Sequence, residues 1–217
     1  MNYRMIVKVC GIRDGDNIRA LEKLNIDWMG FIFYPGSPRY VPDMNEYIDV
    51  IQSCSKSRVG VFVNEESAEI VRKVAKYGLH YIQLHGDESP GFCQRLREEG
   101  CTVIKAFSVS FGDDLLQTVE YEPFVDFFLF DTKSSQYGGT GKRFDWSVLE
   151  AYRGDTPFLL SGGIGVEHVN ELLAFAHPLL AGIDLNSRFE LLPAVKDIGL
   201  IEWFIGQIIP SNSLKGI

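Results

Sequence analysis

The chain has 217 residues, of which 46% are hydrophobic and 23% are charged, and its formal net charge at pH 7 is -8. A chain of this length can bury a substantial core, as one sizeable globular domain or two small ones. The acidic balance argues against broad binding to nucleic acid or to anionic membranes, because both depend on clustered Lys and Arg. An anionic small molecule stays compatible with it, provided that positive groups converge locally.

Nothing in the sequence indicates export or a membrane span. There is no run of about 18 uninterrupted apolar residues, and the start "MNYRMIVKVC" lacks the long apolar segment of a secretory signal. The cysteines show neither C-x-x-C spacing nor the density of a disulfide scaffold, and they are Cys10, Cys54, Cys93 and Cys101. We therefore expect a cytoplasmic protein with reduced thiols.

Short apolar runs, often rich in β-branched residues, recur along the chain with segments of helical character between them. The runs start roughly 21 to 31 positions apart, about the length of one βα unit in a parallel sheet. We predict one strand in each run, at residues 5–10, 28–33, 58–63, 80–85, 102–107, 126–131, 157–162 and 180–185.

Capping residues mark several of the helical segments. Side chains that can accept hydrogen bonds from first-turn N–H groups stand at their starts, at Asp43, Asn64, Ser89 and Asp145. Gly78 and Gly100 follow "ESAEIVRKVAKY" and "PGFCQRLREE", where a left-handed residue commonly ends a helix. Local propensity and the hydrophobic pattern thus agree.

Eight βα units favour an α/β fold of the closed (β/α)₈ type, the TIM barrel, whose strands are buried on both faces. We expect this single barrel to span residues 1–209, with residues 210–217 as a loose tail. The competing architecture is an open doubly wound sheet, which usually carries G-x-G-x-x-G after its first strand; here that position reads "CGIRDG". In a barrel, catalysis takes place where the strands end.

Cys10 ends the first predicted strand. Buried cysteine is commonly inert packing, and a thiol becomes a base or nucleophile only as the thiolate, which needs positive charge nearby. Lys8 lies two residues earlier on the same face of the strand, and Gly11 would permit close approach by a ligand. The position favours a functional thiol, whose protonation state the sequence does not fix.

Asp131 and Arg39 also follow strands. The apolar run "FFLF" before Asp131 predicts a carboxyl group emerging from a dry wall, where burial favours the protonated acid; a helix cap or an ion pair with Lys133 is equally compatible. Arg39 lies in "YPGSPRYV", a loop stiffened by prolines. A guanidinium there suits the capture of a carboxylate, although a solvated surface arginine fits as well.

Gly162 and Gly163 lie where the seventh strand leads into "SGGIG". Free backbone N–H groups at such a turn bind phosphate, and the loops after strands seven and eight are the frequent phosphate site of this barrel. The alternative is an ordinary tight turn, which would not account for the polar run "DLNSR" after strand eight. We therefore expect a phosphorylated small molecule as the partner.

Other motifs fail. "GGTGKR" lacks the Ser or Thr that a P-loop requires after Lys142. No spacing typical of a metal site links the histidines to cysteines or acids, and the histidines are His80, His85, His168 and His177. His85, at a strand end, is either a core histidine or a substrate contact. We therefore expect no metal site.

Taken in order, the strand ends resemble those of the phosphoribosylanthranilate isomerases of tryptophan biosynthesis. The resemblance covers nearly the whole chain, and its most specific motifs are "YPGSPRYV" and "GGTGKRFDW", with "VKVCGI", "IQLHGDE", "FDTK", "LLSGGI" and "GIDLNSRFE" between and around them. It implies a (β/α)₈ barrel that performs an Amadori rearrangement, from an aminoaldose to an aminoketose, by general acid and base catalysis without cofactor or metal.

The resemblance also assigns roles. Cys10 would be the general base, Asp131 the general acid, and Arg39 the partner of the anthranilate carboxylate. The sugar or the catalytic wall would be contacted by Gln83, His85 and Asp184. The phosphate would be bound by Gly162, Gly163, Asn186 and Ser187.

The chain departs from the family pattern at two places. It reads "IGVEHV" where the family is closer to "LNPENV", and "NSRFE" where "SSGVE" is commoner, so that Arg188 replaces a glycine. Arg188 either adds a charge contact to the phosphate or points outward. Residues 132–144, rich in glycine and polar residues, suit a loop that closes over the substrate.

Two alternatives stay open. A histidine-pathway aminoaldose isomerase would have an aspartate in place of Cys10 and two phosphate sites. A non-catalytic barrel would bind a phosphorylated metabolite without converting it. The sequence is compatible with a monomer or a homodimer.

Overall fold

The computed structural model describes residues 5–132 and 145–209. Eight parallel strands form one closed barrel in chain order, and each pairs with its neighbours. The strands are β1 (Ile6–Cys10), β2 (Trp28–Ile32), β3 (Ser57–Phe62), β4 (Tyr81–Leu84), β5 (Val103–Val109), β6 (Phe127–Thr132), β7 (Phe158–Ser161) and β8 (Leu180–Leu185). All eight predicted strands and the (β/α)₈ class are confirmed.

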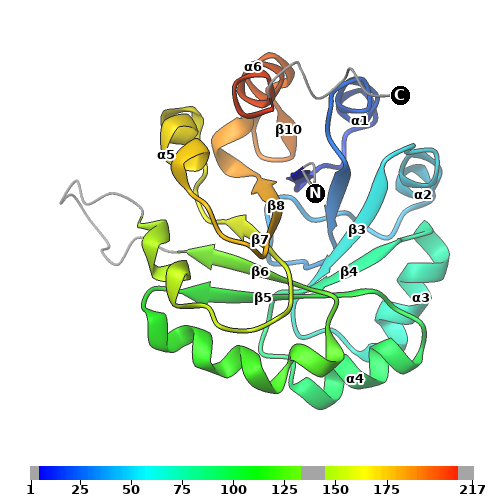
Figure 1. The fold of residues 1–217 in the computed structure, drawn as a ribbon. Coiled ribbons are helices and arrows are strands. Elements are labelled where there is room, and N and C mark those ends of the chain that lie inside the picture. The colour runs from blue at the N-terminus through cyan, green and yellow to red at the C-terminus, as the bar shows by residue number, and fades with distance from the viewer. Residues whose placement is uncertain (1–4, 133–144, 210–217) are drawn as a thin grey trace, which may run out of the picture.

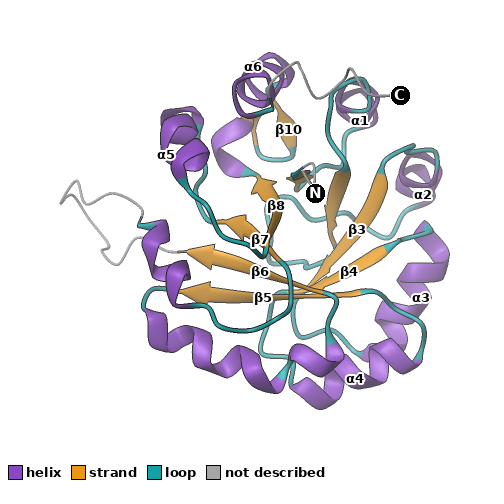
Figure 2. Cartoon of the chain, viewed as in Figure 1, coloured by secondary structure: helices purple, strands orange, loops and turns teal. Residues whose placement is uncertain are grey.

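Helices surround the barrel on its outer side (Figures 1 and 2). The α-helices are α1 (Gly15–Leu21), α2 (Asn45–Gln52), α3 (Ser67–Tyr77), α4 (Pro90–Glu98), α5 (Val169–Ala174) and α6 (Ile198–Ile208). The 3₁₀ segments are η1 (Gly112–Glu120), η2 (Glu122–Phe124), η3 (Trp146–Ala151), η4 (Val166–His168) and η5 (Ser187–Phe189). After β8 the chain also forms a small antiparallel hairpin from β9 (Glu190–Leu192) and β10 (Val195–Lys196).

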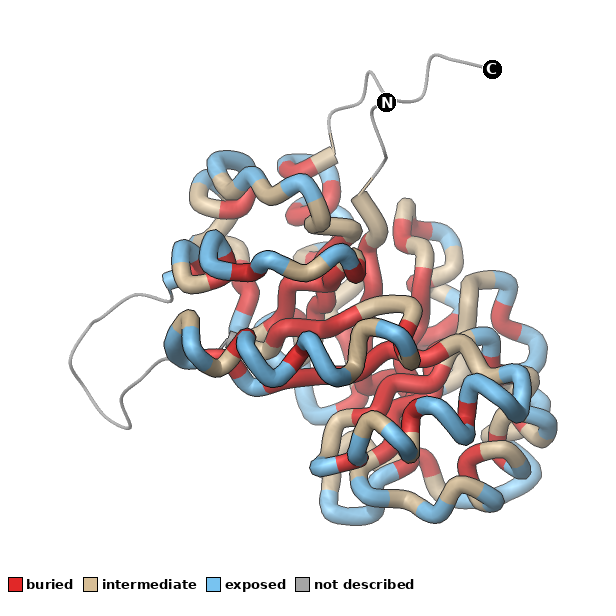
Figure 3. The backbone as a smooth tube through the Cα atoms, turned by 60° about the horizontal axis from the view of Figure 1, so that its bottom comes forward, coloured by how far each residue is buried: buried red, intermediate tan, exposed pale blue. Residues whose placement is uncertain are grey.

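Burial follows the two faces of the strands. Because side chains alternate along a strand, one set packs outward against the helices and the other fills the barrel. The outward set belongs to a large buried cluster that includes Val7, Val9 and Phe31. Figure 3 shows the strands mostly buried and the outer turns of the helices exposed. Among the described residues, no helix is both long and apolar enough to cross a membrane.

The inner set changes from apolar to polar along the strands. A second cluster contains Trp28, Ile104, Leu129 and Leu159. Further along β1, β6 and β8 the inward positions are taken by polar side chains such as Lys8, Asp131 and Asp184. The apolar layer therefore supports a polar floor at the carboxyl ends of the strands.

The capping predictions have mixed outcomes. Ser89 caps α4, Asp145 caps η3, and Gly78 ends α3 in the left-handed conformation. Gly100, with φ of 83°, lies one residue beyond the C-cap of α4.

Asp43 and Asn64 were wrongly predicted as caps, because α2 and α3 begin after Met44 and Glu66. Asp43 instead accepts hydrogen bonds from Arg72, Lys76 and Tyr77 of α3. At Asp43, hydrogen bonds from α3 take the place of the predicted helix cap.

Candidate active site

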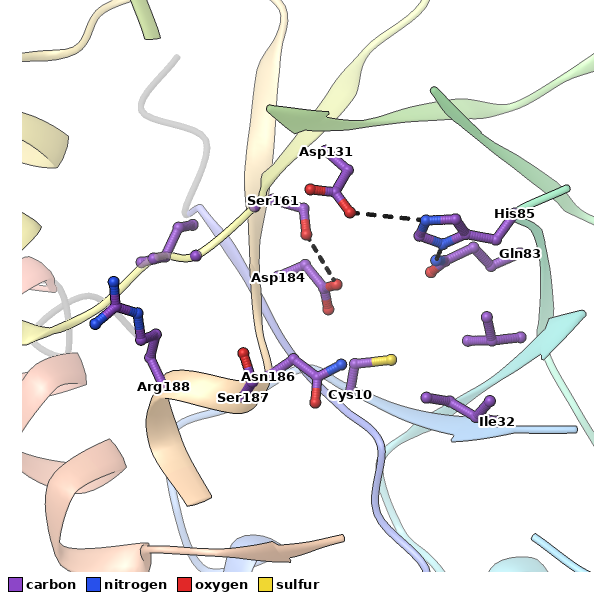
Figure 4. A pocket seen from close by; sticks show the side chains of 14 residues that line it. Cys10, Ile32, Gln83, His85, Asp131, Ser161, Asp184, Asn186, Ser187 and Arg188 are labelled. Carbon is purple, nitrogen blue, oxygen red and sulfur yellow. Dashed lines mark hydrogen bonds and ion pairs between the residues drawn. The ribbon is translucent and has the colours of Figure 1, made fainter. Parts of the chain in front are cut away.

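A cavity of about 180 Å³ opens at the carboxyl ends of the strands. Its walls bring together nearly all of the predicted site residues: Cys10, Gln83, His85, Asp131, Gly162, Gly163, Asp184, Asn186 and Ser187. Arg39 is the predicted residue that does not line it. Figure 4 shows Cys10 and Asp131 on opposite sides of this cavity, with His85 and Gln83 on a third side.

Cys10 lies at the end of β1 and is 3% exposed. Gly30 of β2 makes room for it, because a Cβ atom there would come within 2.6 Å of the Cys10 Sγ. Burial raises the pKa of the Cys10 thiol, and the Asp184 carboxylate acts in the same direction, while the cations Lys8 and Lys196 act to lower it. Positive charge next to the buried thiol would stabilise its thiolate.

Lys8 and Asp184 form a buried ion pair beneath Cys10. Lys8 Nζ lies 2.8 Å from Asp184 Oδ1, and the lysine side chain is fully buried. Although burial alone would lower it, the Asp184 carboxylate raises the pKa of Lys8 above its usual value. Asp184 Oδ2 also accepts a hydrogen bond of 3.3 Å from the Ser161 hydroxyl. The lysine therefore stays charged at the cavity floor.

Asp131 ends β6 and faces His85, with 3.7 Å between the carboxylate Oδ2 and the imidazole Nε2. The Asp131 side chain is 27% exposed, so its surroundings are wetter than the apolar run before it predicts. Gln83 Nε2 lies 2.9 Å from His85 Nδ1. His85 is thus held between Gln83 on one ring nitrogen and Asp131 on the other.

Gln83 has a second feature of interest. The residue is 1% exposed, and its Oε1 has no hydrogen-bond partner in the part of the chain that the structure describes. A buried acceptor without a partner is costly. Since Gln83 lines the cavity, a hydroxyl group of a bound ligand can supply the missing hydrogen bond.

Arg39 is held beside the cavity by Glu190. Its Nε and Nη2 lie 2.8 and 2.5 Å from the two carboxylate oxygens of Glu190, and Glu190 Oε1 also accepts from Lys196 Nζ at 2.8 Å. Lys196 donates in addition to Asn186 Oδ1. The buried Glu190 carboxylate thereby holds both Arg39 and Lys196 in place. Lys196 in turn orients Asn186 in the wall of the cavity.

Gly11 has a different role from the one predicted. It adopts a left-handed φ of 77°, and a Cβ atom there would lie 2.5 Å from the Arg39 Cδ and 2.9 Å from the Asn186 Oδ1. The space beside Gly11 is therefore filled by side chains of the protein itself and is not open to a ligand. The glycine lets the β1 loop pack under Arg39.

The turn after β7 leaves open space. Gly162 and Gly163 both adopt positive φ, of 96° and 69°, and nothing lies within 4 Å of a Cβ atom built on Gly163. Ser187 and Arg188 of η5 line the same part of the cavity. Both glycines line the cavity, and without side chains they let the backbone approach a bound ligand closely.

The structure adds residues that sequence reasoning missed. Ile32, Val61 and Ile164 supply the apolar part of the wall, and Ser161 contributes a hydroxyl. Glu190 and Ser161 could have been found only from their neighbours in space. The loop predicted to close over the site, residues 132–144, lies almost entirely outside the described residues, as does the tail 210–217. Within the described ranges no cluster of three or more His, Cys, Asp and Glu side chains could hold a metal ion.

Lys105 anchors the loop that carries His85. Its Nζ lies 3.0 Å from Glu88 Oε2 and donates to the carbonyl oxygens of Leu84 and Gly86, and both charged side chains are 2% exposed. Glu88 Oε1 in turn accepts from the backbone N–H of Asn64. The pair therefore joins the loops after β3 and β4 at the edge of the cavity.

Lys105→Met is expected to lower the free energy of unfolding by about 3–5 kcal/mol, because it leaves the Glu88 carboxylate buried without its cation. Urea denaturation measures this loss. Arg19→Ala is the matched control, since it breaks an exposed ion pair with Asp16 and is expected to cost less than about 1 kcal/mol. Equal losses in the two variants would contradict the anchoring role.

Comparison with known proteins gives a consistent family. The family model described as N-(5'phosphoribosyl)anthranilate (PRA) isomerase matches residues 7–207. A protein from Phocaeicola vulgatus named N-(5'-phosphoribosyl)anthranilate isomerase is 52% identical over 94% of this chain and 98% of its own length. A protein of the same name from Parabacteroides distasonis is 50% identical over 94% of both chains.

Solved structures agree. Phosphoribosyl anthranilate isomerase from Thermotoga maritima superposes with a TM-score of 0.79 at 33% identity, covering 94% of this chain and 98% of that one. A phosphoribosyl anthranilate isomerase in complex with reduced 1-(o-carboxyphenylamino)-1-deoxyribulose 5-phosphate superposes with a TM-score of 0.77 at 31% identity, over the same shares of the two chains.

Proposed function

The chain belongs to the N-(5'-phosphoribosyl)anthranilate isomerase family, and from this premise we propose that it catalyses the Amadori rearrangement of N-(5-phosphoribosyl)anthranilate in tryptophan biosynthesis. The product is 1-(2-carboxyphenylamino)-1-deoxyribulose 5-phosphate. The observation that carries the proposal is one cavity whose walls contain a thiol from β1, a carboxylate from β6 and the glycine turn after β7.

The reaction needs one acid and one base. Asp131 protonates the ring oxygen of the ribose as the bond from C1 to that oxygen breaks, and the ring opens to a Schiff base. Cys10 then removes the proton from C2, which gives an enolamine that tautomerises to the ketone. Because these steps move protons and electron pairs within one substrate, with no net oxidation or reduction, the chemistry calls for neither a cofactor nor a metal.

The buried charges support Cys10 as the base. Removing the thiol proton leaves an anion in a buried site, which is costly without compensation. Lys8, held by Asp184, and Lys196, held by Asn186 and Glu190, both favour the thiolate. These lysines lie beneath the cavity and do not line it, so they stabilise the base without occupying the substrate's place.

The other wall residues fit the groups of the substrate. Gln83, His85 and Asp184 offer hydrogen bonds to the hydroxyls of the opened sugar, and Gln83 Oε1 still needs a partner within the described part of the chain. The phosphate is assigned to Gly162, Gly163, Asn186 and Ser187, where the turn leaves open space.

Arg39 is assigned to the anthranilate carboxylate. Glu190 occupies the Nε and Nη2 positions of its guanidinium, and Arg39 retains further N–H donors, since a guanidinium has five. Glu190 thus holds Arg39 in one orientation at the cavity edge, ready for a second carboxylate.

Turnover of freshly prepared phosphoribosylanthranilate tests the proposal. The purified chain is expected to consume the fluorescent substrate and to form the aminoketose, identified by mass and by its chromatographic position. Binding without product formation would instead favour a non-catalytic phosphate-binding barrel. Turnover of the aminoaldose of the histidine pathway with no turnover of phosphoribosylanthranilate would move the chain to that related reaction.

The pH dependence of kcat/KM is expected to be bell-shaped. Cys10 must be deprotonated to act, and burial raises its pKa above the ordinary value of 9.0, so activity is lost as pH falls below that pKa. The rising limb should therefore extend through neutral into alkaline pH with a slope of about tenfold per pH unit. A profile that stays flat between about pH 6 and pH 9 would contradict a thiolate base.

Assembly and location complete the proposal. A Thermotoga maritima structure is described as that of monomers of a dimeric phosphoribosylanthranilate isomerase. For this chain of 24.5 kDa, monomer and homodimer both stay predictions that sedimentation equilibrium separates by mass. We place the protein in the cytoplasm, where an amino-acid biosynthetic enzyme meets its substrate, with no nucleic acid or membrane among its partners.

A further inference from the structure

We propose that Arg188 is a specificity-determining residue that pairs with the phosphate group of the substrate, and that Glu167 holds this arginine in the empty enzyme and competes with the phosphate for it. The inference rests on the proposed function, and in particular on the phosphate site at the turn after β7.

The charge of the cavity favours a cation at the phosphate site. Among the described lining residues, two carboxylates, Asp131 and Asp184, face the cavity, and Arg188 is the one Lys or Arg side chain in its wall. The substrate brings a phosphate and a carboxylate into this acidic protein. Repulsion between these anions would oppose binding unless a positive group lies at the phosphate.

The other nearby cations are already held by buried carboxylates. Lys8 is paired with Asp184, whose side chain is 6% exposed. Arg39 and Lys196 are paired with Glu190, whose side chain is 5% exposed. Exchanging such a partner would leave a buried carboxylate uncompensated, which is strongly unfavourable.

The Arg188 pair has a different character. Arg188 Nη1 lies 3.3 Å from Glu167 Oε1, and the two side chains are 58% and 50% exposed. An exposed pair of this kind contributes little to stability, and Glu167 can return to water when its partner leaves. Arg188 is therefore available for exchange between two anions.

The positions of the two loops support this exchange. Glu167 lies in η4, just after the glycine turn, and Arg188 lies in η5, just after β8. Figure 4 shows Arg188 on the side of the cavity formed by Ser187 and the turn after β7. A guanidinium in this place can pair with a phosphate through two parallel hydrogen bonds, an arrangement that Arg favours.

Substitutions of Arg188 and of Glu167 are expected to change phosphate affinity in opposite directions. This contrast separates a phosphate-binding role of Arg188 from a purely structural role of the ion pair. Arg188→Gly is expected to raise the Kd of inorganic phosphate, measured by ³¹P NMR titration, and the KM of phosphoribosylanthranilate by about tenfold each. Its kcat should stay within about twofold, since the phosphate takes no part in the proton transfers. Glu167→Gln frees the arginine and is expected to lower both Kd and KM by about two- to threefold.

Further variants sharpen the test. Arg188→Lys keeps the charge and should retain most of the affinity, while the double variant Arg188→Gly with Glu167→Gln should match Arg188→Gly alone. The difference in phosphate affinity between wild type and Arg188→Gly should become smaller as the salt concentration rises, because an exposed charge is screened. Circular dichroism and thermal unfolding of all variants report whether the fold is intact.

If Glu167→Gln weakens phosphate binding as much as Arg188→Gly does, the pair is a structural clasp and the inference fails. It fails also if Arg188→Gly leaves the phosphate Kd unchanged. If wild type binds phosphate through Arg188 but does not convert phosphoribosylanthranilate, the proposed function fails and the phosphate contact stands.

Discussion

Cys10→Ala is expected to lower kcat by about 10²- to 10⁴-fold, the range that one positioned general base contributes. The variant removes the group that abstracts the C2 proton. It adds no charge and leaves the ion pair between Lys8 and Asp184 in place. The KM should change little, because a buried thiol contributes little to binding of the ground state. Steady-state kinetics with phosphoribosylanthranilate measure both quantities.

Cys54→Ala is the matched control. Cys54 has the same exposure as Cys10, 3%, but its Sγ contacts Met29 Sδ and it does not line the cavity. The Cys54→Ala variant should lose some stability and keep the kcat of wild type. A Cys10→Ala enzyme with more than about one tenth of the wild-type kcat would contradict the thiol as the base, and so would a rising limb of the pH profile that persists without it.

The strand ends could be predicted from the sequence because they follow from periodicity and topology. Once the runs at residues 5–10 and 126–131 are strands of one parallel barrel, their last residues must meet at the same end. Cys10 and Asp131 share a cavity for this reason. Their chemical roles required the resemblance to a family, since periodicity does not distinguish a base from a buried thiol.

The partners of these side chains could not be predicted in the same way. Lys8 pairs with Asp184, and Arg39 with Glu190, across most of the length of the chain. No local rule reports such a contact, because closure of the barrel brings β1 beside β8. The role of Gly11 was misjudged for the same reason, since the side chains that fill its space come from distant segments.

The helical segments between β5 and β7 show a further limit. Between β5 and β7 the described helices are of the 3₁₀ type, although the sequence pattern there is helical and apolar in period. A 3₁₀ helix and an α-helix differ by less than one residue per turn, so a short amphipathic segment does not separate them. The barrel is covered in either case, and the position of Asp131 at the end of β6 is unaffected.

Asp131→Asn is expected to lower kcat/KM by about 10²- to 10⁴-fold, because the amide has the shape of the carboxyl group but no acidic proton to transfer to the ring oxygen. The 3.7 Å approach between His85 and Asp131 should survive the substitution, so the cavity keeps its form. The rising limb of the pH profile should persist, because Cys10 is unchanged.

Asp16→Asn is the control for that substitution, since Asp16 is 91% exposed and pairs with Arg19 on the surface; its kinetics should match wild type. Of the two catalytic variants, only Cys10→Ala should lose the rising limb of the pH profile. If Asp131→Asn keeps a kcat/KM near that of wild type, the acid is another group. His85, whose Nε2 faces Asp131, is the next side chain within reach of the same part of the cavity, and His85→Gln would then be expected to lower kcat/KM in its place.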